Sequence, residues 1–248
     1  MSTTNTAGSN IPHSSIQSYF DELLKRLGVL RSDLEARLGA LESCPGSETV
    51  DEHVQQSIKL LRESLQLPLS GAGFVAVEDY ISNVQWHMAW WQGPELERRL
   101  LVAMETAGDI YPRREWFSIP ISEQRVHIAG PYVDFLCTDD YTLTFTSPVL
   151  VGGKAVGIAG FDLLVADFEE PMSRMLQELD PRATVINSHG KVLASASAQL
   201  ACGARLVRDW DGGNAYGVAL ASDEGLGQRI DIQAMVGLPL GLVLPTSD

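Results

Sequence analysis

The sequence is poor in cysteine and in basic residues. Its three cysteines, Cys44, Cys137 and Cys202, lie far apart and form no Cys-x-x-Cys pair. An odd number of separated cysteines offers no disulfide framework and is typical of a reducing compartment. Lysine and arginine number 18 against 32 acidic residues, so the net charge is −14. Because nucleic-acid binding depends on clustered Lys and Arg, this balance argues against a nucleic-acid partner.

Long hydrophobic runs and a secretion signal are also missing. No apolar run reaches the roughly 18 residues that a membrane-spanning helix needs. The first 15 residues are rich in Ser, Thr and Asn, without the basic and apolar sections of a signal peptide. We therefore expect a cytoplasmic protein that does not enter a membrane, with residues 1–15 as a disordered tail.

The motifs of common enzymes are absent too. The chain has no Gly-x-Ser-x-Gly, no Walker motif, no His-Glu-x-x-His and no Gly-x-Gly-x-x-Gly. Its five histidines are not clustered as metal ligands would be. We therefore expect no catalysis, no bound metal and no cofactor.

Residues 16–67 have the spacing of helices. Apolar residues recur at steps of three and four along one face: Ile16, Phe20, Leu23, Leu27, Leu30, Leu34, Leu38 and Leu41. This face either packs on its own domain or also pairs with a second subunit, which would give a homodimer through Ile16–Leu41. A second amphipathic segment follows the break at Cys44-Pro45-Gly46 and ends at Pro68.

The rest of the chain reads as strands with short connections. Residues 141–151 alternate polar and apolar side chains, and Gly152-Gly153 leads into a second run, which predicts a hairpin. Residues 111–130 read as a loop. This pattern predicts an α+β fold, with a long N-terminal helix packed on antiparallel sheets. We expect a larger module over 68–180 and a smaller one over 181–248.

Groups that bind a small zwitterion or amine are concentrated in one stretch. Arg114 and the adjacent Arg113 carry guanidinium groups, which hold a carboxylate through a bidentate fork. Carboxylates and aromatic faces hold an ammonium group. The candidates for that end are Asp134, Asp162, Asp139 or Asp140, Trp116, Tyr132 and Trp90.

The order of these fragments resembles the Cache family of sensor domains, in its PAS-like double-Cache arrangement. The resemblance rests on Arg114-x-Trp116, then Pro131-Tyr132-x-Asp134, a Thr-rich strand, a Gly turn, and Gly160-x-Asp162. It covers most of the chain. The family is best known from bacterial chemoreceptors and sensor kinases.

The resemblance also implies roles for these residues. In the branch that binds amino acids, Arg114 and Trp116 would hold the ligand carboxylate, and Tyr132, Asp134 and Asp162 its ammonium group. Two positions depart from that branch: Phe117 replaces a Tyr, and Asp109 stands where the branch has a Tyr. An amine thus competes with an α-amino acid as the ligand. The full set expected at the ligand is Arg114, Trp116, Tyr132, Asp134, Asp162, Tyr111, Trp90, Asp140 and Thr144.

The resemblance implies a free-standing, soluble small-molecule sensor that signals through a separate partner protein. The alternative is an interaction or scaffold protein that has a Cache fold and no functional ligand pocket.

Overall fold

The chain forms two compact units, each built around one antiparallel sheet. The computed structural model describes residues 10–41, 44–64, 69–100, 110–134, 140–208, 210–219 and 229–246. One unit is Leu23–Phe168, and the other combines Met1–Glu22 with Glu169–Asp248.

Two helices open the chain, α1 (Asn10–Gly39) and α2 (Ser47–Ser64). The expected tail boundary at residue 15 is wrong, because residues 10–15 already belong to α1. Pro12 does not prevent this, since it falls in the first turn, where a missing N–H breaks no helical hydrogen bond. Of the helices within the described residues, none has the length and hydropathy needed to cross a bilayer.

The apolar stripe of α1 is used within its own chain. Seven of its eight residues are fully buried: Ile16, Phe20, Leu23, Leu27, Leu30, Leu34 and Leu38. The eighth, Leu41, follows the end of the helix and is partly exposed. Packing on its own domain thus accounts for the stripe, and a second subunit would have to contact other faces of α1.

The larger unit contains a six-stranded antiparallel sheet in the order β3-β2-β1-β6-β5-β4. Its strands are β1 (Gly71–Ala76), β2 (Met88–Gln92), β3 (Arg98–Arg99), β4 (His127–Val133), β5 (Tyr141–Val151) and β6 (Lys154–Leu164). The predicted hairpin is confirmed as β5 and β6, joined by Gly152 and Gly153 at positive φ. The expected α+β fold with a larger first module is therefore correct.

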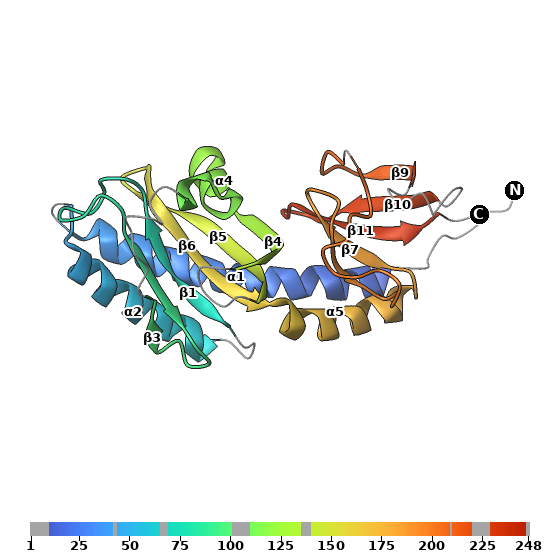
Figure 1. The fold of residues 1–248 in the computed structure, drawn as a ribbon, viewed down its shortest axis with the longest axis horizontal. Helices are drawn as coiled ribbons and strands as arrows, with labels where there is room; N and C mark the ends of the chain where they lie inside the picture. The colour runs from blue at the N-terminus through green and yellow to red at the C-terminus, as the bar shows by residue number, and fades with distance from the viewer. Residues whose placement is uncertain are drawn as a thin grey trace, which may run out of the picture. The chain divides into compact units, whose positions relative to one another are not determined.

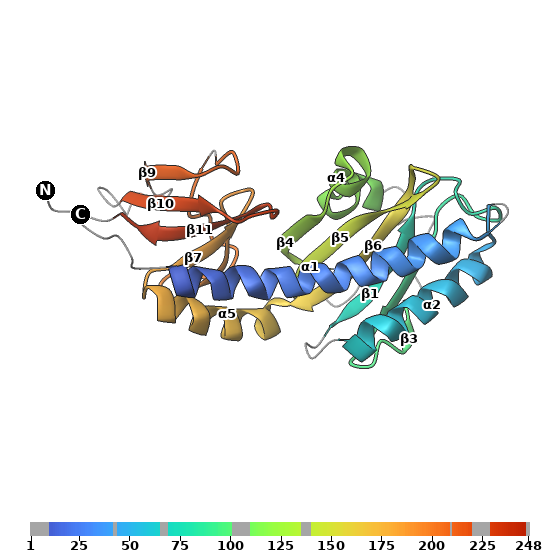
Figure 2. The ribbon, with the colours of Figure 1, turned by 180° about the vertical axis from the view of Figure 1, so that it is seen from behind.

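Strand alternation gives this sheet two different faces. Phe74, Phe145 and Phe161 share one face and are fully buried, and the rings of Phe145 and Phe161 stack with centroids 5.1 Å apart. Figure 2 shows α1 and α2 side by side over this face. The opposite face carries the cavity described below.

A short helix covers the other side of the sheet, where the sequence predicts a loop. The 3₁₀ turn η1 (Tyr111–Arg113) leads into α4 (Glu115–Glu123), which packs on β4, β5 and β6 (Figure 1). The loop prediction is wrong because tertiary packing outweighs the proline signal. Phe117 is buried, and the carbonyl of Arg114 accepts hydrogen bonds from the amides of Phe117 and Ser118.

The smaller unit contains a five-stranded antiparallel sheet in the order β8-β7-β11-β10-β9. After α5 (Val165–Leu179) come β7 (Thr184–Asn187), β8 (Val192–Ser195), β9 (Ala215–Ala219), β10 (Arg229–Ala234) and β11 (Leu240–Pro245). Gln17 of α1 donates to the carbonyl of Val236 at 3.1 Å and accepts from its amide at 3.2 Å. The N-terminal part of α1 is thereby attached to the β10–β11 turn.

Candidate ligand-binding site

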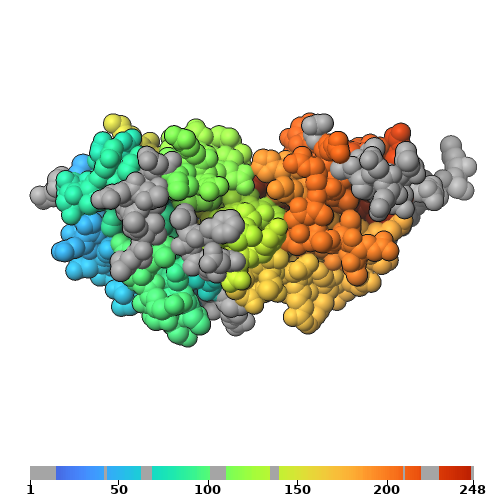
Figure 3. Space-filling view, viewed as in Figure 1, coloured from blue at the N-terminus to red at the C-terminus, as the bar shows by residue number. Residues whose placement is uncertain are grey.

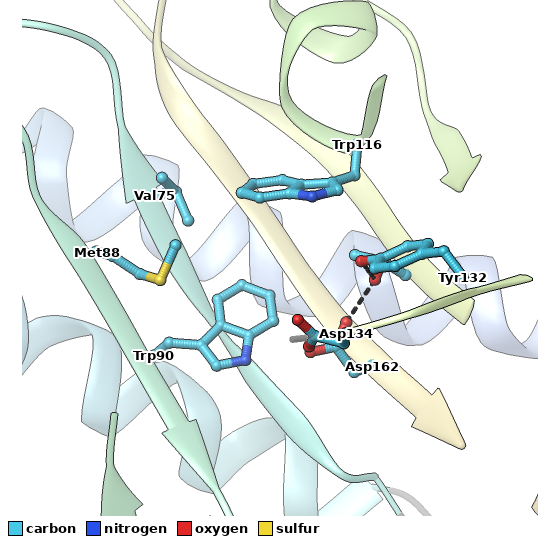
Figure 4. A pocket seen from close by; sticks show the side chains of 8 residues that line it. Val75, Met88, Trp90, Trp116, Tyr132, Asp134 and Asp162 are labelled. Atoms are coloured by element: carbon cyan, nitrogen blue, oxygen red, sulfur yellow. Dashed lines mark hydrogen bonds between the residues drawn. The ribbon is translucent and has the colours of Figure 1, made fainter. Parts of the chain in front are cut away.

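A cavity lies on the face of the six-stranded sheet that α1 and α2 leave uncovered. We call it the inner cavity (Figure 4), and it is lined by Val75, Met88, Trp90, Trp116, Tyr132, Asp134, Thr144 and Asp162. Its free space is about 340 Å³, including the part open to solvent. The space inside it that a water-sized group can occupy is about 30 Å³, which is enough for an ammonium group but not for a whole metabolite.

Glycines make room for the cavity. Gly71, Gly73 and Gly160 occupy its face of the sheet, since Gly71 pairs with Asp162, and Gly73 pairs with both Trp90 and Gly160. A Cβ on Gly71 would lie 2.5 Å from Trp90 Nε1, and one on Gly160 would lie 3.2 Å from Trp90 Cη2. Because these three glycines carry no side chain, the indole of Trp90 can pack directly against the sheet.

A β-bulge brings Tyr132 to the same face. In β4, Ala129 pairs with Thr144 but Tyr132 pairs with Thr142, so β4 contains one extra residue. Gly130 has φ 112° there, and a Cβ on it would lie 2.6 Å from the carbonyl oxygen of Thr142. One extra residue in a strand moves every later side chain to the opposite face of the sheet. The bulge therefore turns Tyr132 toward the cavity.

The polar end of the cavity is a chain of hydrogen bonds that ends on Asp162. The hydroxyl groups of Tyr132 and Thr144 lie 2.5 Å apart, and Thr144 Oγ1 donates to Asp162 Oδ1 at 2.7 Å. Asp162 is 3% exposed and Asp134 is 7% exposed. Burial, and next the charge of Asp134, raise the pKa of Asp162 to about 8. Thr144 and Trp90 act in the opposite sense, because their donors favour the carboxylate.

The indole N–H of Trp90 faces Asp162 (Figure 4), close enough to lower the pKa of that carboxyl but outside the geometry of a hydrogen bond. The Trp90 side chain is buried, and its Nε1 has no hydrogen-bond partner among the residues that the structure describes. A buried donor without an acceptor costs about 1–3 kcal/mol. This N–H is therefore available to a ligand atom or to an ionised Asp162.

The other end of the cavity is apolar and aromatic. Val75, Met88 and the rings of Trp90 and Trp116 form it (Figure 4). Val75 and Met88 are absent from the site expected from the sequence. Strand alternation could have identified them, since Val75 is two residues beyond Gly73 on β1, and Met88 is two residues before Trp90 on β2.

The two arginines line an adjoining outer cavity. Its wall contains Arg113, Arg114, Glu115 and Val133, together with three residues of the inner cavity, Trp116, Tyr132 and Asp134. Both arginines are exposed. Figure 3 shows the same side of the molecule as Figure 1 in space-filling form, with α4 in green. Arg114 thus lies next to the inner cavity but not on its wall, and Arg113 shares this position.

Two residues expected at the ligand lie elsewhere. Tyr111 is fully buried, and its ring stacks on Trp116 at 6.1 Å and meets Phe117 edge-on at 5.1 Å, so it is a core residue. Asp140 is exposed and lines neither cavity. Its carbonyl oxygen instead accepts from the Asp134 amide at 3.1 Å and from the Thr142 hydroxyl at 3.1 Å. Asp139, Asp109 and Cys137 lie outside the described residues.

The other expected residues meet at one place. Trp90, Trp116, Tyr132, Asp134, Thr144 and Asp162 line the inner cavity together, although they come from β2, α4, β4, β5 and β6. Within the described ranges, no group of three or more His, Cys, Asp and Glu side chains is arranged to hold a metal ion. The site therefore offers carboxylates, hydroxyls and aromatic faces.

Comparison of the whole chain with known proteins gives matches of structure only. No family model matches the sequence, and no curated protein does. The ligand-binding domain of the amino-acid chemoreceptor PctC of Pseudomonas aeruginosa, in complex with GABA, is 19% identical with a TM-score of 0.56, and 95% of each chain is covered. The ligand-binding domain of the chemoreceptor CtaA of Pseudomonas fluorescens, in complex with L-isoleucine, is 13% identical with a TM-score of 0.58. That match covers 96% of this chain and 89% of CtaA.

A sensor kinase gives a match of the same quality. The extracellular domain of the putative histidine kinase soHK1S-Z6 is 13% identical with a TM-score of 0.58, and 93% of this chain and 89% of that chain are covered. These matches extend over both sheets and the long first helix. The chain therefore has the fold of the Cache-type sensory ligand-binding domains of chemoreceptors and histidine kinases.

Proposed function

We propose that this protein is a small-molecule sensor without catalytic activity, whose inner cavity binds the ammonium group of a small amine or amino-acid-like metabolite. One observation carries the proposal: two buried carboxyl groups, Asp134 and Asp162, lie at one end of a cavity with aromatic walls. No basic side chain is among the eight described residues that line it. An organic cation is the ligand that this combination favours.

The energetics support a cation. An ammonium group that leaves water costs several kcal/mol unless it is paired and hydrogen-bonded. Asp134 and Asp162 supply the charge, and the hydroxyl group of Tyr132 supplies a further acceptor. The faces of Trp90 and Trp116 add roughly 0.5–2 kcal/mol of cation–π attraction each.

The outer cavity supports a ligand with a second, anionic end. Arg113 and Arg114 line it, and it shares Trp116, Tyr132 and Asp134 with the inner cavity. An ammonium group in the inner cavity and a carboxylate near the arginines would need several bonds between them. The similar domains of PctC and CtaA, crystallised with GABA and L-isoleucine, hold ligands with an ammonium group.

A matched panel of four-carbon ligands tests the proposal by thermal shift. It contains n-butylammonium, 4-aminobutyrate, its isomer L-2-aminobutyrate, and butyrate. We expect the first two to raise the Tm and butyrate to leave it unchanged. A ligand at 100 times its Kd stabilises the native state by about 2.7 kcal/mol, which shifts the Tm of a chain of this size by roughly 5–10 °C. If no cation of the panel shifts the Tm, the proposal fails and the scaffold alternative is favoured.

Variants assign the two ends of the ligand. Asp162→Asn should abolish the shift by every cation of the panel. Arg114→Ala and Arg113→Ala should weaken the shift by 4-aminobutyrate and spare that by n-butylammonium. Arg125→Ala is the matched control, because Arg125 is an exposed arginine that pairs with Glu123 and lines neither cavity. Equal losses for both ligands in the arginine variants would exclude a carboxylate site in the outer cavity.

The proposal also includes a signalling partner protein and a cytoplasmic location. The low cysteine content supports a reducing compartment, whereas the similar kinase domain is described as extracellular. Cell fractionation distinguishes the two locations. A pull-down with and without 4-aminobutyrate tests for a partner whose binding depends on the ligand. Light scattering tests for a dimer, which would use faces of α1 other than its buried stripe.

A further inference from the structure

Asp162 is positioned as a site where a proton and a cation compete. Its Oδ1 accepts a hydrogen bond from Thr144, and the unpartnered N–H of Trp90 faces its carboxyl group. Both donors would stabilise a carboxylate, yet burial and Asp134 oppose its charge. The missing component is a positive charge, which either a bound proton or a ligand can provide.

The groups that face Asp162 come from every strand around it. Asp134 and Tyr132 lie at the end of β4, Thr144 on β5, and Trp90 on β2. Its partner on β1 is Gly71, which has no side chain. The charged residues where η1 leads into α4 line the outer cavity instead: Arg113, Arg114 and Glu115. Among the residues that the structure describes, Asp134 is therefore the only other carboxyl group on the wall of the inner cavity.

The hydrogen-bond chain has a different direction in each state of Asp162. With Asp162 ionised, Thr144 donates to it and Tyr132 donates to Thr144, so the Tyr132 oxygen keeps its role as an acceptor. With Asp162 protonated, its O–H can donate to Thr144, and Thr144 can donate to Tyr132. The Tyr132 hydroxyl then points its own proton away from Thr144, where it opposes a cation.

We propose that Asp162 exchanges its proton for the ammonium group of the ligand, so that each cation bound releases one proton to solvent. This inference rests on the proposed function and adds the number of protons that are released when the ligand binds. The O–H bond of Asp162 breaks, the proton goes to the buffer, and the carboxylate that remains pairs with the ligand. A neutral ligand of the same shape displaces no proton and gains no ion pair.

The affinity for a cation should rise with pH. Because the pKa of Asp162 is about 8, the free protein holds this proton at neutral pH. Below pH 8 the cation must displace it, so the affinity should rise about tenfold for each pH unit between pH 5 and 7. Above pH 8 the carboxylate is already formed and the affinity should level off. The ligand keeps its own charge over this range, since alkylamines titrate near pH 10 as lysine does.

Calorimetry of the full chain with n-butylammonium tests the exchange. Titrations at pH 6.5 in two buffers of different ionisation enthalpy should show close to one proton released per ligand, and at pH 9 close to none. Binding without proton release at pH 6.5 would overturn the inference and leave the proposed function intact. No binding of n-butylammonium or 4-aminobutyrate would overturn both.

Two variants should shift the pH dependence of the ligand affinity in opposite directions. Thr144→Val removes a donor that favours the carboxylate, so the pH at which the affinity levels off should rise. Asp134→Asn removes the neighbouring charge, so that pH should fall. Thr146→Val is the control, because Thr146 is buried on the same strand and does not line the cavity. Asp162→Asn should abolish both binding and proton release, and binding with unchanged release in this variant would assign the proton to another group.

Discussion

The two sheets of this protein have similar architecture and opposite interiors. On the cavity face of the six-stranded sheet, three glycines carry no side chain, and Thr144 and Asp162 place polar groups beside the gap. In the five-stranded sheet, Ile186, Val192, Ile232 and Val243 fill the core, with Trp210 packed against them. A Cβ on Gly241 would lie 2.8 Å from both Ile232 and Trp210, so an indole covers this glycine, as Trp90 covers the glycines of the cavity face.

Buried polar groups differ between the sheets as well. In the smaller unit, the hydroxyl groups of Thr184 and Ser195 bond at 2.8 Å, and Asn187 Oδ1 accepts from the amides of His189 and Lys191. In the larger unit, the Trp90 N–H has no acceptor within the described residues, and Asp162 is desolvated. The first arrangement stabilises the fold, and the second gives up stability at the proposed binding site.

The largest effect should come from filling the proposed binding site with an apolar side chain, as the core of the smaller unit is filled. Asp162→Leu should raise the free energy of unfolding at pH 9 by on the order of 3 kcal/mol, since it removes a buried carboxylate. The folded pKa of Asp162 is raised from 3.8 to about 8, so the wild type loses stability as the pH rises through this window. The gain should therefore almost vanish at pH 4. Urea unfolding at both pH values measures it, and an equal gain at each would contradict the titration of Asp162.

Replacing the glycine of the bulge should lower the free energy of unfolding by nearly as much. Gly130→Ala should destabilise the protein by roughly 2–4 kcal/mol and displace Tyr132, because the backbone is left-handed there and the carbonyl of Thr142 blocks a Cβ. Gly212→Ala is the matched control, with φ 86° and nothing within 4 Å of its Cβ. The control should cost only about 1 kcal/mol. Equal costs in thermal unfolding would show that the bulge tolerates a side chain.

Truncating one valine in each unit should lower the free energy of unfolding by unequal amounts. Val243 is enclosed by the second core, so Val243→Ala should cost about 2 kcal/mol. Val75 has the cavity on one side, and Val75→Ala should cost about 1 kcal/mol because fewer contacts are lost. Only the Val75 variant should change the relative affinities of the four-carbon ligands. Chemical unfolding and calorimetry measure both quantities, and a larger loss at Val75 would mean that the cavity is filled.

The smallest effect concerns the hydroxyl pair of the second sheet. Thr184→Val should cost about 1 kcal/mol, with no dependence on pH from 5 to 9. Ser195 still accepts a hydrogen bond from the Ser197 amide at 3.1 Å in this variant. Thr144→Val should cost a similar amount but move the titration of Asp162 upward. If both variants show the same pH dependence, the polar groups of the two sheets do not differ as described.

Periodicity predicted the fold well. The steps of three and four over residues 16–38 identified α1, and the alternation in 141–151 with the Gly152-Gly153 turn identified the β5–β6 hairpin. These signals are local, since they depend on which side chains of one segment share a face. The helix α4 was missed because Pro112 and Pro120 suggest a loop, and only the packing of Phe117 and Trp116 on the rest of the unit makes this segment helical.

The site was predicted less completely. The Arg-x-Trp, Tyr-x-Asp and Gly-x-Asp fragments pointed to four residues that share one cavity: Trp116, Tyr132, Asp134 and Asp162. The sequence could not separate Tyr111, a core residue, from Trp116, which lines the cavity, because both are aromatic and five positions apart. Nor could it place the arginines outside the inner cavity, since that depends on the path of α4 across the sheet.

The sequence by itself determined which segments are helices and strands in most of the chain, and which residue types could hold a cation. Side-chain periodicity and composition are properties of the chain alone, so they can be read before it folds. Tertiary structure decided that Asp134 and Asp162 share one desolvated end of a cavity, with the donor of Trp90 beside them. Burial and the distance between charges exist only once the strands pair, and they set the proton affinity on which the proposed exchange depends.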